Sequence, residues 1–521
     1  MSSKIFKISM VAATVAASFS ASAALYNVYK YEPVVDANAQ TFGSAVQEST
    51  GGLSCWSSDC SDHETVHKIG YEEQRFLQGF EYRNEAPFLF EYGYEYLEDD
   101  RDGFEDYCNR YLDYADTLCE KWAYRQYDSG YAKEGSLNNS YAFVENSSSP
   151  VQGSQDNVVI NKIDISGNAL GNYYGGSLKN RTKAFDGTTE LVFSGVQSKV
   201  FAKISGVDDI QVGSVSFSTS NANDFRSQAA IWVNGTEKLI TTSGAVSSRS
   251  MPQGSARDIA DVGGTVYAVG YNANKDEIPV AAVFNLSTPT SPTTEFVGTY
   301  TDDEKYLNSL LTSVNDKGIA IGTAKYREAN DGAYSNSLFY VPDVTASSLS
   351  SKSFSGDIFF KSANGKAGAI NNNSEVVGAV DYERHRESNG GKPRAQRAFI
   401  APLSSADAKA PLGNKAWYLD DLTNGIAANN QFRIIDAADI NDAGVIAGTA
   451  YYCAGGYDSS AINASCSSGA SLVAVKLVPI NGATASNISA RPVDKNKVER
   501  QGGSIGVWAL TILALFGFRR K

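Results

Sequence analysis

Short apolar stretches alternate with turns rich in Asn, Asp and Gly along most of the chain. The pattern is clearest at residues 314–322, 370–378 and 440–448, where an apolar residue precedes Asn-Asp-x-Gly or a close variant, and a second apolar stretch then ends in Gly. Asn, Asp and Gly tolerate the positive φ angles of tight turns. Each segment is therefore predicted to form two antiparallel strands joined by a tight turn, with the final Gly leaving room for a neighbouring backbone.

Weaker copies of this unit end at Gly171, Gly213 and Gly270. A third short apolar strand follows each copy, at residues 184–185, 230–232, 282–284, 337–339, 398–400 and 472–474. Successive final glycines, from Gly171 to Gly448, are 42, 57, 52, 56 and 70 residues apart, which leaves space for about four short strands per unit. Such a unit cannot bury its apolar face alone and must pack against copies of itself.

Radial closure is the common solution for units of this size, and it gives a β-propeller of roughly four to eight blades. We therefore predict an all-β, repeat-built propeller over residues 24–480, with seven blades, or six as the alternative. The seventh unit is expected near the N-terminus, where residues 36–43 resemble the turn and strand and residues 86–90 resemble the third strand. Two insertions are predicted to interrupt the array, at residues 47–84 and at about residues 91–146.

The second insertion is predicted to be helical because six residues in it recur at helical spacing. They are Phe104, Cys108, Tyr111, Ala115, Leu118 and Trp122. The simpler interpretation is an apolar stripe that packs onto the β body, and the alternative is a ligand platform.

Six cysteines, an even number, favour disulfides in an exported chain. Cys453 and Cys466 lie far from the rest and are expected to pair, whereas Cys55 and Cys60 could close a small loop. Metal binding by these cysteines is not expected, because the chain contains no C-x-x-C pair.

Cys108 and Cys119 would lie about 16 Å apart on one continuous helix, whereas a disulfide requires Cα atoms within about 7 Å. Residues 117–120 have the S/T-x-x-E form of a capping box. A new helix that starts at Thr117 would create a helical hairpin and let the two cysteines pair. Cross-pairing with Cys55 and Cys60 is the alternative.

The formal net charge of −13 argues against nucleic acid as a partner, since an acidic surface repels phosphate. The 46 glycines and 29 tyrosines also suit strands and turns better than a helix bundle.

The N-terminus has the three parts of a secretory signal peptide. Lys4 and Lys7 precede an apolar region at residues 8–19, and Ser-Ala-Ser-Ala ends at Ala23. Residues 1–23 are therefore predicted to direct export through the Sec machinery. Signal peptidase is expected to cut after Ala23, with Ala24 as the alternative.

At the other end, Gly502 and Gly503 precede an apolar run at residues 504–518 and a basic end, Arg519 to Lys521. The run is short against the roughly 17–25 residues of a membrane-spanning helix, and the basic end would stay in the cytoplasm. The adjacent glycines weaken helix locally by about 1 kcal/mol each, which an intramembrane protease requires. Residues 502–521 are predicted to be a membrane-spanning sorting tail, and residues 481–501 a polar linker.

Residues 63–67 match the H-E-x-x-H pattern, in which two His residues one helical turn apart bind zinc. His63 and His67 are thus candidate metal ligands, but a polar Ser/Asp run and the expected Cys55–Cys60 loop precede them, which does not suit a buried zinc helix. We therefore predict no metal centre, with zinc at His63 and His67 as the alternative.

An acidic stretch fits part of an EF-hand calcium loop, through Glu98, Asp100, Asp102 and Gly103. Its twelfth position is Asn109 instead of Glu, so a solvated acidic loop is the simpler interpretation. There is no Gly-x-Ser-x-Gly elbow or nucleotide fingerprint. We predict no catalytic residues and no cofactor, with Ca²⁺ or Zn²⁺ as the alternatives.

The Asn-Asp-x-Gly-x-Val-x-Gly pattern followed by Ala-Phe resembles the HAF-type extracellular repeat family. The Gly-Gly pair with its apolar span and basic end resembles the GlyGly-CTERM sorting signal of Gram-negative bacteria. The whole chain resembles an uncharacterised family of exported Gram-negative proteins, a domain of unknown function. The second resemblance implies cutting near Gly502 and Gly503 by a rhombosortase-type protease. It also implies a precursor anchored in the inner membrane, type II secretion, and a mature form at the cell surface or outside the cell.

Together these features predict an exported, surface-sorted binding or interaction protein for a glycan or protein ligand, in preference to an enzyme. The alternative is a secreted hydrolase, either a zinc peptidase through His63 and His67 or a propeller enzyme. Carboxylates clustered in the central channel would favour an enzyme or a cation site, whereas an aromatic rim would favour binding.

Overall fold

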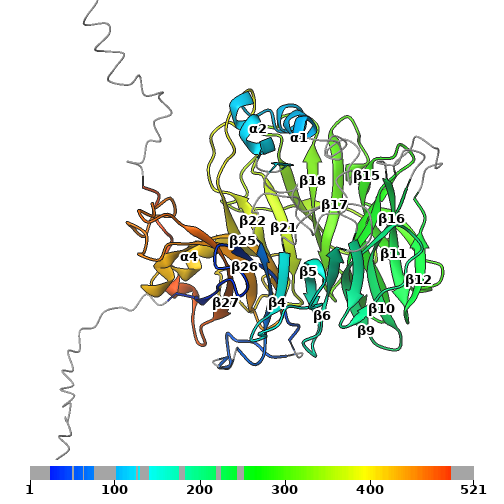
Figure 1. Ribbon diagram of the computed structural model, residues 1–521, viewed down its shortest axis with the longest axis horizontal. Coiled ribbons are helices and arrows are strands. Elements are labelled where there is room, and N and C mark those ends of the chain that lie inside the picture. Colours follow the sequence, from blue (N-terminus) through cyan, green and yellow to red (C-terminus); the bar gives the residue numbers. More distant parts are fainter. Residues whose placement is uncertain are drawn as a thin grey trace, which may run out of the picture.

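Seven small antiparallel sheets surround one axis in the computed structural model (Figure 1). The structure describes residues 24–49, 52–60, 62, 64–74, 101–124, 127–128, 140–174, 182–218, 225–242 and 252–494. The predicted signal peptide and sorting tail, with Ala23, Gly502 and Gly503, lie outside this range. Among the described residues, no helix is long and apolar enough to span a bilayer.

Each sheet is one blade, and its strands are named in order from the axis outward. Blade 1 contains β2 (Gln40–Val46), β3 (Ile69–Gln74) and β4 (Ser140–Val144); blade 2 contains β5 (Asp156–Ile163), β6 (Ala169–Tyr174), β7 (Thr182–Asp186) and β8 (Thr189–Glu190); blade 3 contains β9 (Gln197–Ser205), β10 (Asp209–Ser218), β11 (Phe225–Val233) and β12 (Thr236–Ile240); blade 4 contains β13 (Gly254–Val262), β14 (Thr265–Ala273), β15 (Pro279–Asn285) and β16 (Thr293–Phe296). Blade 5 contains β17 (Tyr306–Val314), β18 (Ala320–Tyr326), β19 (Asn336–Val341) and β20 (Lys352–Ser353); blade 6 contains β21 (Gly365–Ile370), β22 (Glu375–Asp381), β23 (Gln396–Pro402) and β24 (Trp417–Tyr418); blade 7 contains β25 (Phe432–Ile440), β26 (Ile446–Tyr452), β27 (Ser471–Pro479) and β1 (Tyr26–Tyr31).

The helical elements in the described part of the chain are few and short. They are α1 (Arg101–Tyr107), the π-helical η1 (Cys108–Leu112), α2 (Asp116–Ala123), α4 (Leu419–Thr423), and the single turns η3 (Gly298–Tyr300), η4 (Ala428–Gln431) and η5 (Ala485–Asn487).

The innermost strands form a closed ring, because each contacts the innermost strand of the next blade and β2 contacts both β5 and β25. The protein is therefore a seven-bladed β-propeller. The prediction of seven blades is confirmed, and the alternative of six is wrong.

The N-terminal strand closes the ring. β1 is the outermost strand of blade 7 and pairs with β27 from Tyr26–Pro479 to Tyr31–Ala474. A buried ion pair between Lys476 of β27 and Glu145 after β4, 2.6 Å long, also joins blades 7 and 1. This closure was not predicted from the sequence.

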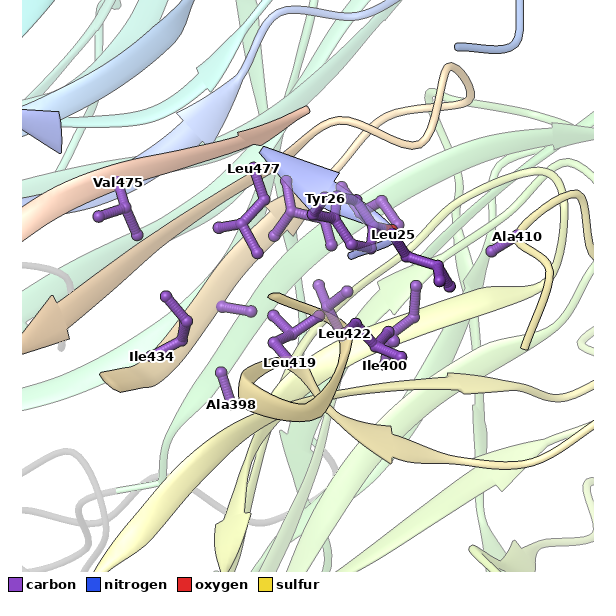
Figure 2. Close-up of a cluster of buried hydrophobic side chains, with 14 of the residues drawn as sticks. Leu25, Tyr26, Ala398, Ile400, Ala410, Leu419, Leu422, Ile434, Val475 and Leu477 are labelled. Carbon is purple, nitrogen blue, oxygen red and sulfur yellow. The ribbon is translucent and has the colours of Figure 1, made fainter. Parts of the chain in front are cut away.

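Apolar side chains fill the spaces between blades. Figure 2 shows the cluster between blades 6 and 7, where Leu419 and Leu422 of α4 pack with Ile400, Ile434 and Leu477. Full burial of each such side chain stabilises the fold by about 1.5–3 kcal/mol.

The final glycine of each repeat lies in the second strand of a blade, where it crosses the first strand very closely. A Cβ atom at Gly322 would lie 2.0 Å from the carbonyl oxygen of Leu310, and one at Gly171 would lie 1.9 Å from that of Val159. A Cβ atom would also lie too close to a carbonyl oxygen of the first strand at Gly213, Gly270, Gly378 and Gly448. The predicted close approach of a neighbouring backbone is confirmed.

The Asn-Asp turns also connect one blade to the next. In blade 5, Asn315 Oδ1 accepts hydrogen bonds from the N–H groups of Lys317 (3.2 Å) and Ile319 (3.0 Å), and its Nδ2 donates to the Asn371 carbonyl in blade 6 (3.0 Å). Asn371 reaches blade 7 in the same way, through Asn441 O (3.1 Å), and Asn441 reaches blade 1 through Gln47 O (2.9 Å).

The positive φ angle in these turns falls on the fourth turn residue, as at Gly318 (76°) and Ser374 (57°). The Asn side chain is therefore needed for its hydrogen bonds and not, as the sequence suggested, for a positive φ.

The two ends of the ring differ. The turns between the first and second strands of the blades contact one another at one end, which we call the turn face. The connections between second and third strands, and those from one blade to the next, lie at the other end, which we call the loop face. The three longest second-to-third-strand connections, residues 75–139, 382–395 and 453–470, begin and end at the loop face.

The first blade is built from other residues than predicted. Its first strand is β2, within the segment expected to be a turn and second strand, and its second strand β3 falls inside the predicted insertion at 47–84. Its third strand is β4, which carries Phe143 and lies within the predicted insertion at 91–146. Residues 86–90, the predicted third strand, lie outside the described residues.

The helical insertion is a disulfide-linked hairpin, as predicted. Cys108 at the start of η1 pairs with Cys119 in α2, with Cα atoms 5.4 Å apart. The hairpin turns at Asp113, which has a positive φ of 52°. However, α2 begins at Asp116 after an Ala115 N-cap without a side-chain hydrogen bond, so the capping box predicted at Thr117 is wrong.

The apolar stripe of the hairpin forms a small cluster of its own, with Phe104 and Ala123 buried against Tyr107, Trp122 and Tyr127. The prediction that this stripe packs onto the β body is therefore wrong for the described residues.

The other two disulfides are Cys55–Cys60 in the turn face of blade 1 and Cys453–Cys466 in the loop face of blade 7. Both match the expected local pairs, and the alternative of cross-pairing is wrong.

Residues 481–494, predicted to belong to a polar linker, pack against the propeller. Gly482 N donates to Trp56 O (3.1 Å), and Arg491 N donates to Asp421 Oδ1 (2.7 Å). Arg491 is only 6% exposed. The folded body therefore extends at least to Asp494.

Candidate functional site

Charged side chains from four blades meet near the axis of the ring. Lys162 of β5, Asp258 of β13 and Asp439 of β25 each directly follow a β-bulge in the first strand of their blade. A bulge re-aims the side chains next to it. Glu48, just after β2, lies with them, and we call these four residues the axial charge cluster. Lys162 interacts electrostatically with all three carboxylates, and side chains from blades 1, 2, 4 and 7 can approach one another only at the axis.

Hydrogen bonds hold two of these carboxylates between blades. Asp258 Oδ2 accepts from the Ser313 hydroxyl (2.6 Å) and from Val314 N (3.0 Å), both in blade 5. Asp439 Oδ2 accepts from Val46 N in blade 1 (3.0 Å). Each carboxylate thus ties its own blade to the next one.

Burial and mutual repulsion shape the protonation of the cluster. Burial raises the pKa of Asp439, with the nearby Lys162 acting against the rise. Burial likewise raises the pKa of Glu48. Asp439 raises the pKa of Lys162 although burial opposes it, so the ammonium group stays charged. The cluster therefore holds one fixed cation beside two carboxylates, Glu48 and Asp439, that take up protons more readily than usual.

Further carboxylates lie near the axis at the turn face. Burial raises the pKa of Asp316, and the neighbouring Asp442 raises it further. Asn372 lies between them and donates to Asp316 Oδ2 (2.9 Å) and Asp442 Oδ2 (3.1 Å). Carboxylates thus cluster near the axis, as expected of an enzyme or a cation site, although the bonds of Asp258 and Asp439 also give these two residues a structural role.

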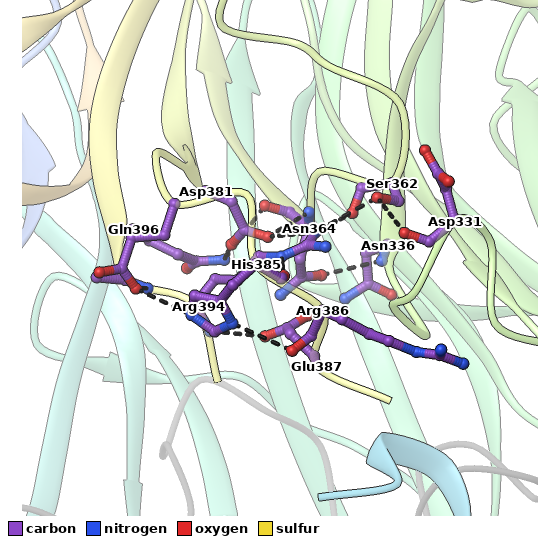
Figure 3. Close-up of polar contacts among 12 residues, drawn as sticks. Asp331, Asn336, Ser362, Asn364, Asp381, His385, Arg386, Glu387, Arg394 and Gln396 are labelled. Carbon is purple, nitrogen blue, oxygen red and sulfur yellow. Dashed lines mark hydrogen bonds and ion pairs between the residues drawn. The ribbon is translucent and has the colours of Figure 1, made fainter. Parts of the chain in front are cut away.

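A second polar network lies at the loop face of blade 6 (Figure 3). Asp381 ends β22 and accepts hydrogen bonds from Asn364 N (2.9 Å) and Gln396 Nε2 (3.0 Å), with Arg394 Nη1 at 3.5 Å. Burial raises the pKa of Asp381 to about 6, and the repulsion of Glu387 adds to the rise.

Arg394 organises the 382–395 connection around this carboxylate. It donates to the carbonyl oxygens of Ser362 (2.8 Å) and His385 (2.5 Å), and its own N–H donates to Glu387 Oε1 (2.7 Å). Burial lowers the pKa of the nearby Lys325 to about 8. Since most of these groups satisfy one another, the network rigidifies the loop.

The helical hairpin from blade 1 docks on this same connection. Asp113 Oδ2 accepts from Asn389 N (2.5 Å), Asp113 O accepts from Gly390 N (2.9 Å), and Ala115 N donates to Gly391 O (3.1 Å). The insertion of blade 1 therefore reaches past blade 7 to blade 6 over the loop face.

The H-E-x-x-H match does not form a zinc helix in the described residues. His63 lies outside them, Glu64 is exposed, and residues 64–67 form turns and bends. His67 is 3% exposed, and its Nδ1 lies 3.2 Å from Asn441 Nδ2. Because Asn441 Oδ1 accepts two backbone N–H groups, its Nδ2 must donate to Nδ1, which places the ring proton of neutral His67 on Nε2. A metal-bound His normally donates from its second ring nitrogen, so this arrangement does not suit zinc.

His67 instead lies beside the Cys55–Cys60 disulfide, with the three potential ligand atoms within 4.8 Å of one another. Disulfide sulfur is not a thiolate, so the oxidised pair offers no ordinary zinc ligand.

The proposed calcium loop is not a loop where the structure describes it. Asp102 and Gly103 lie in α1, and Asn109 lies in η1. Glu98 and Asp100 lie outside the described residues. The interpretation as a solvated acidic loop is therefore wrong from Arg101 onward.

The axial charge cluster was not predicted from the sequence. Lys162, Asp258 and Asp439 occupy equivalent positions in their blades, where Ser313 stands in blade 5 and Ala45 in blade 1. The residue type thus changes from blade to blade, so the repeat pattern carries no signal for it. The usable signal was a charged residue directly before the apolar end of a first strand.

The fold and this charge cluster define the chain as a β-propeller with a charged axis. Residues 201–521, more than half of the chain, match the model of a family described as protein of unknown function (DUF3466). The protein belongs to this family, which confirms the expected membership of an uncharacterised family.

No curated protein matches the sequence. Among solved structures, the chain is similar to a β-fructofuranosidase of Bombyx mori (9% identity, TM-score 0.26, covering 46% of this chain and 58% of that one). It is also similar to a putative glycoside hydrolase of Parabacteroides distasonis (11% identity, TM-score 0.26, covering 56% of this chain and 90% of that one). A third similar structure is an α-L-arabinanase of Cellvibrio cellulosa (12% identity, TM-score 0.23, covering 40% of this chain and 76% of that one). Such low scores support no conclusion about function.

Proposed function

We propose that the protein is an exported binding module whose loop face takes a glycan or protein ligand at the cell surface. One observation carries this proposal: the three longest second-to-third-strand connections open at the loop face, whereas the first-to-second-strand turns at the turn face are short in every blade except blade 1. Functional residues of repeat folds concentrate on such variable connections.

The loop face is also the more heavily braced end. Two of the three disulfides, Cys108–Cys119 and Cys453–Cys466, lie in its insertions. Cys108–Cys119 ties the two helical arms of the hairpin together, and Cys453–Cys466 constrains a connection with little regular structure. A rigid surface loses less entropy on binding. The hairpin docked on blade 6 adds a second rigid element.

Export and sorting remain part of the proposal. The signal peptide ending at Ala23 would bring the chain through the Sec machinery. A rhombosortase-type protease would then cut the tail near Gly502 and Gly503, and type II secretion would deliver the mature form to the surface. Mass spectrometry of the mature protein should find neither residues 1–23 nor Arg519 to Lys521, and an intact tail on exported protein would contradict the sorting step.

The ligand should be sought with residues 24–501 in a screen of glycans and envelope components, run beside zinc analysis. A double variant, Asp113→Ala with Tyr114→Ala, removes the side-chain contacts that dock the hairpin on blade 6: Asp113 Oδ2 with Asn389 N, and the Tyr114 hydroxyl with Glu387 Oε1 (3.4 Å). It should weaken binding at least about tenfold, or about 1.4 kcal/mol. The matched turn-face variant Lys317→Ala should leave binding within about twofold. Binding that survives the first variant and fails in the second would contradict the assignment to the loop face.

A propeller hydrolase is the second candidate, favoured by the convergence of Glu48, Asp258 and Asp439 on Lys162. Glu48 is the best candidate for an acid, because burial raises its pKa, whereas the carboxylates of Asp258 and Asp439 accept hydrogen bonds from a neighbouring blade. If the chain hydrolyses a polysaccharide, Glu48→Gln should lower kcat by about 10²-fold or more at unchanged stability. Equal kcat values for Glu48→Gln and the wild type would exclude Glu48 as a catalytic residue.

A further inference from the structure

The last described segment carries the chain from the turn face to the loop face. Gly482 N contacts Trp56 O in the Cys55–Cys60 loop, at the turn face. Twelve residues later, Asp494 exchanges two hydrogen bonds with Asn463 in the 453–470 connection, at the loop face (2.8 and 2.9 Å). Figure 1 shows this orange-to-red segment running beside α4.

Arg491 fixes the segment in place near its loop-face end. Its Nε donates to Asp420 O (2.7 Å), and its Nη1 donates to Asn430 Oδ1 (3.0 Å) and Ser460 O (3.0 Å). These partners come from two connections of the loop face. The chain therefore leaves the folded body at this face, beside blade 7.

Little chain separates this exit point from the predicted sorting tail. Residues 495–501 span at most about 25 Å when fully extended. A small protein domain measures about 30 Å across. A tail embedded in a bilayer would thus keep the exit point within less than one domain diameter of the lipid surface.

We propose that the precursor is held with its loop face toward the membrane, so that this face is covered until the tail is cut. The inference rests on the proposed function of the loop face and adds its regulation: proteolysis both releases the protein and uncovers its binding surface. A precursor in the inner membrane would then not capture ligands before it reaches its destination.

Cysteine labelling tests the orientation without any ligand. The six native cysteines are paired, so a single added cysteine can be followed. Ala428→Cys places it on the loop face between blades 6 and 7, and Ala406→Cys places it on the turn face of blade 6. Both alanines are exposed. The chain from residue 24 onward is inserted by its tail into vesicles of phosphatidylethanolamine and phosphatidylglycerol, with a specific protease sequence replacing residues 495–501.

A maleimide with a bulky polyethylene glycol chain should label Ala428→Cys about tenfold more slowly before cleavage than after it. A tenfold difference in labelling rate corresponds to about 1.4 kcal/mol. Ala406→Cys should label at equal rates in both states. A flexible Gly/Ser insertion of about 30 residues after Asp494, with an average span of about 30 Å, should remove the difference for Ala428→Cys.

Equal labelling of Ala428→Cys before and after cleavage would overturn the proposed orientation. That result would leave the binding function standing, since the screen with residues 24–501 uses protein without a tail. Conversely, a negative binding screen combined with slow labelling of the anchored form would reject the function and keep the orientation.

Discussion

At the residue scale, the repeat glycines are fixed by the distance between two backbones. Gly322 crosses the first strand of blade 5 so closely that a methyl group would meet the Leu310 carbonyl at 2.0 Å. Real Cβ atoms do not approach an oxygen so closely, so the strands must separate to accept any side chain. The same close crossing recurs in six blades. Glycine is therefore required at this position so that the first and second strands of the sheet can pair closely, and not because of a turn.

Gly322→Ala should therefore lower the free energy of unfolding by about 1–3 kcal/mol, as overpacked cores do. Gly298→Ala is the matched control, because a Cβ atom there has no neighbour within 4 Å, and its effect should stay within about 0.5 kcal/mol. Urea unfolding of both variants measures the difference. Equal stability of Gly322→Ala and the wild type would show that the crossing can relax without cost.

Asp381 should make the stability of blade 6 depend on pH. Burial raises its pKa to about 6, above the value of 3.8 for a free side chain, so between these values the folded state binds more protons than the unfolded state. Stability contributed by this group is then highest below pH 4 and falls as pH rises toward 6, by about 3 kcal/mol in total.

Asp381→Asn keeps the shape of the side chain and removes its titration. The variant should gain stability relative to the wild type as the pH of thermal unfolding is raised from 4 to 7. A constant difference between the two proteins over this range would show that Arg394 keeps Asp381 ionised throughout.

At the scale of elements, the strands that the sequence predicted best are those with a complete Asn-Asp-x-Gly unit. The six third strands predicted for blades 2 to 7, such as residues 398–400 in β23, all occupy the third position of a blade. The apolar pattern sufficed there because each strand is buried on both faces between blades. Blade 1 was misassigned because its first-to-second-strand connection, residues 47–68, is long and hides the unit.

Elements held by distant polar contacts were missed. Residues 481–494 carry few apolar side chains, so their composition suggested a linker. Their docking depends on the buried Arg491 and its partners in two loops more than 30 positions away, and no local pattern reports such contacts. The same reason explains why β1 was not recognised as a strand of blade 7.

Arg491→Ala should release this element. The variant leaves the buried Asp420 carbonyl and the Asn430 and Ser460 oxygens without their donor, at a cost of about 3 kcal/mol. Hydrogen exchange of residues 485–494 should become fast, while exchange in β25 and β26 stays slow. Arg491→Lys keeps the positive charge but loses the several N–H donors of the guanidinium group. Hydrogen exchange of residues 485–494 in this variant should be faster than in the wild type and slower than in Arg491→Ala. Unchanged protection in Arg491→Ala would show that other contacts hold the segment.

At the scale of the whole molecule, the axial charge cluster also joins blades that are not neighbours in the ring. Lys162 in blade 2 faces carboxylates from the adjacent blade 1 and from the more distant blades 4 and 7. Without this cation, the carboxylates would repel one another near the axis, and the repulsion would grow as they lose protons. The cluster thus acts as an electrostatic cross-link through the centre of the ring.

Lys162→Met should destabilise the protein by about 3 kcal/mol at pH 7.5, within the range for removing one partner of a buried ion pair. The loss should shrink at pH 4, because protonated carboxyl groups no longer repel one another. The surface variant Lys317→Met should cost less than about 1 kcal/mol at both pH values. A loss for Lys162→Met that does not change with pH would show that packing, and not charge, is lost.

The pairing of β1 with β27 has a consequence for the order in which the molecule is assembled. Tyr26 is among the first described residues of the chain, but its strand partner Pro479 is among the last, so this contact spans nearly the whole sequence. Contacts between such distant positions form slowly, because the intervening chain must first be ordered. Blades 2 to 6 can each form from adjacent residues, whereas the final sheet must wait until the last strand has been made. An incomplete chain therefore remains an open arc with an unpaired edge, which makes it a ready substrate for chaperones and proteases.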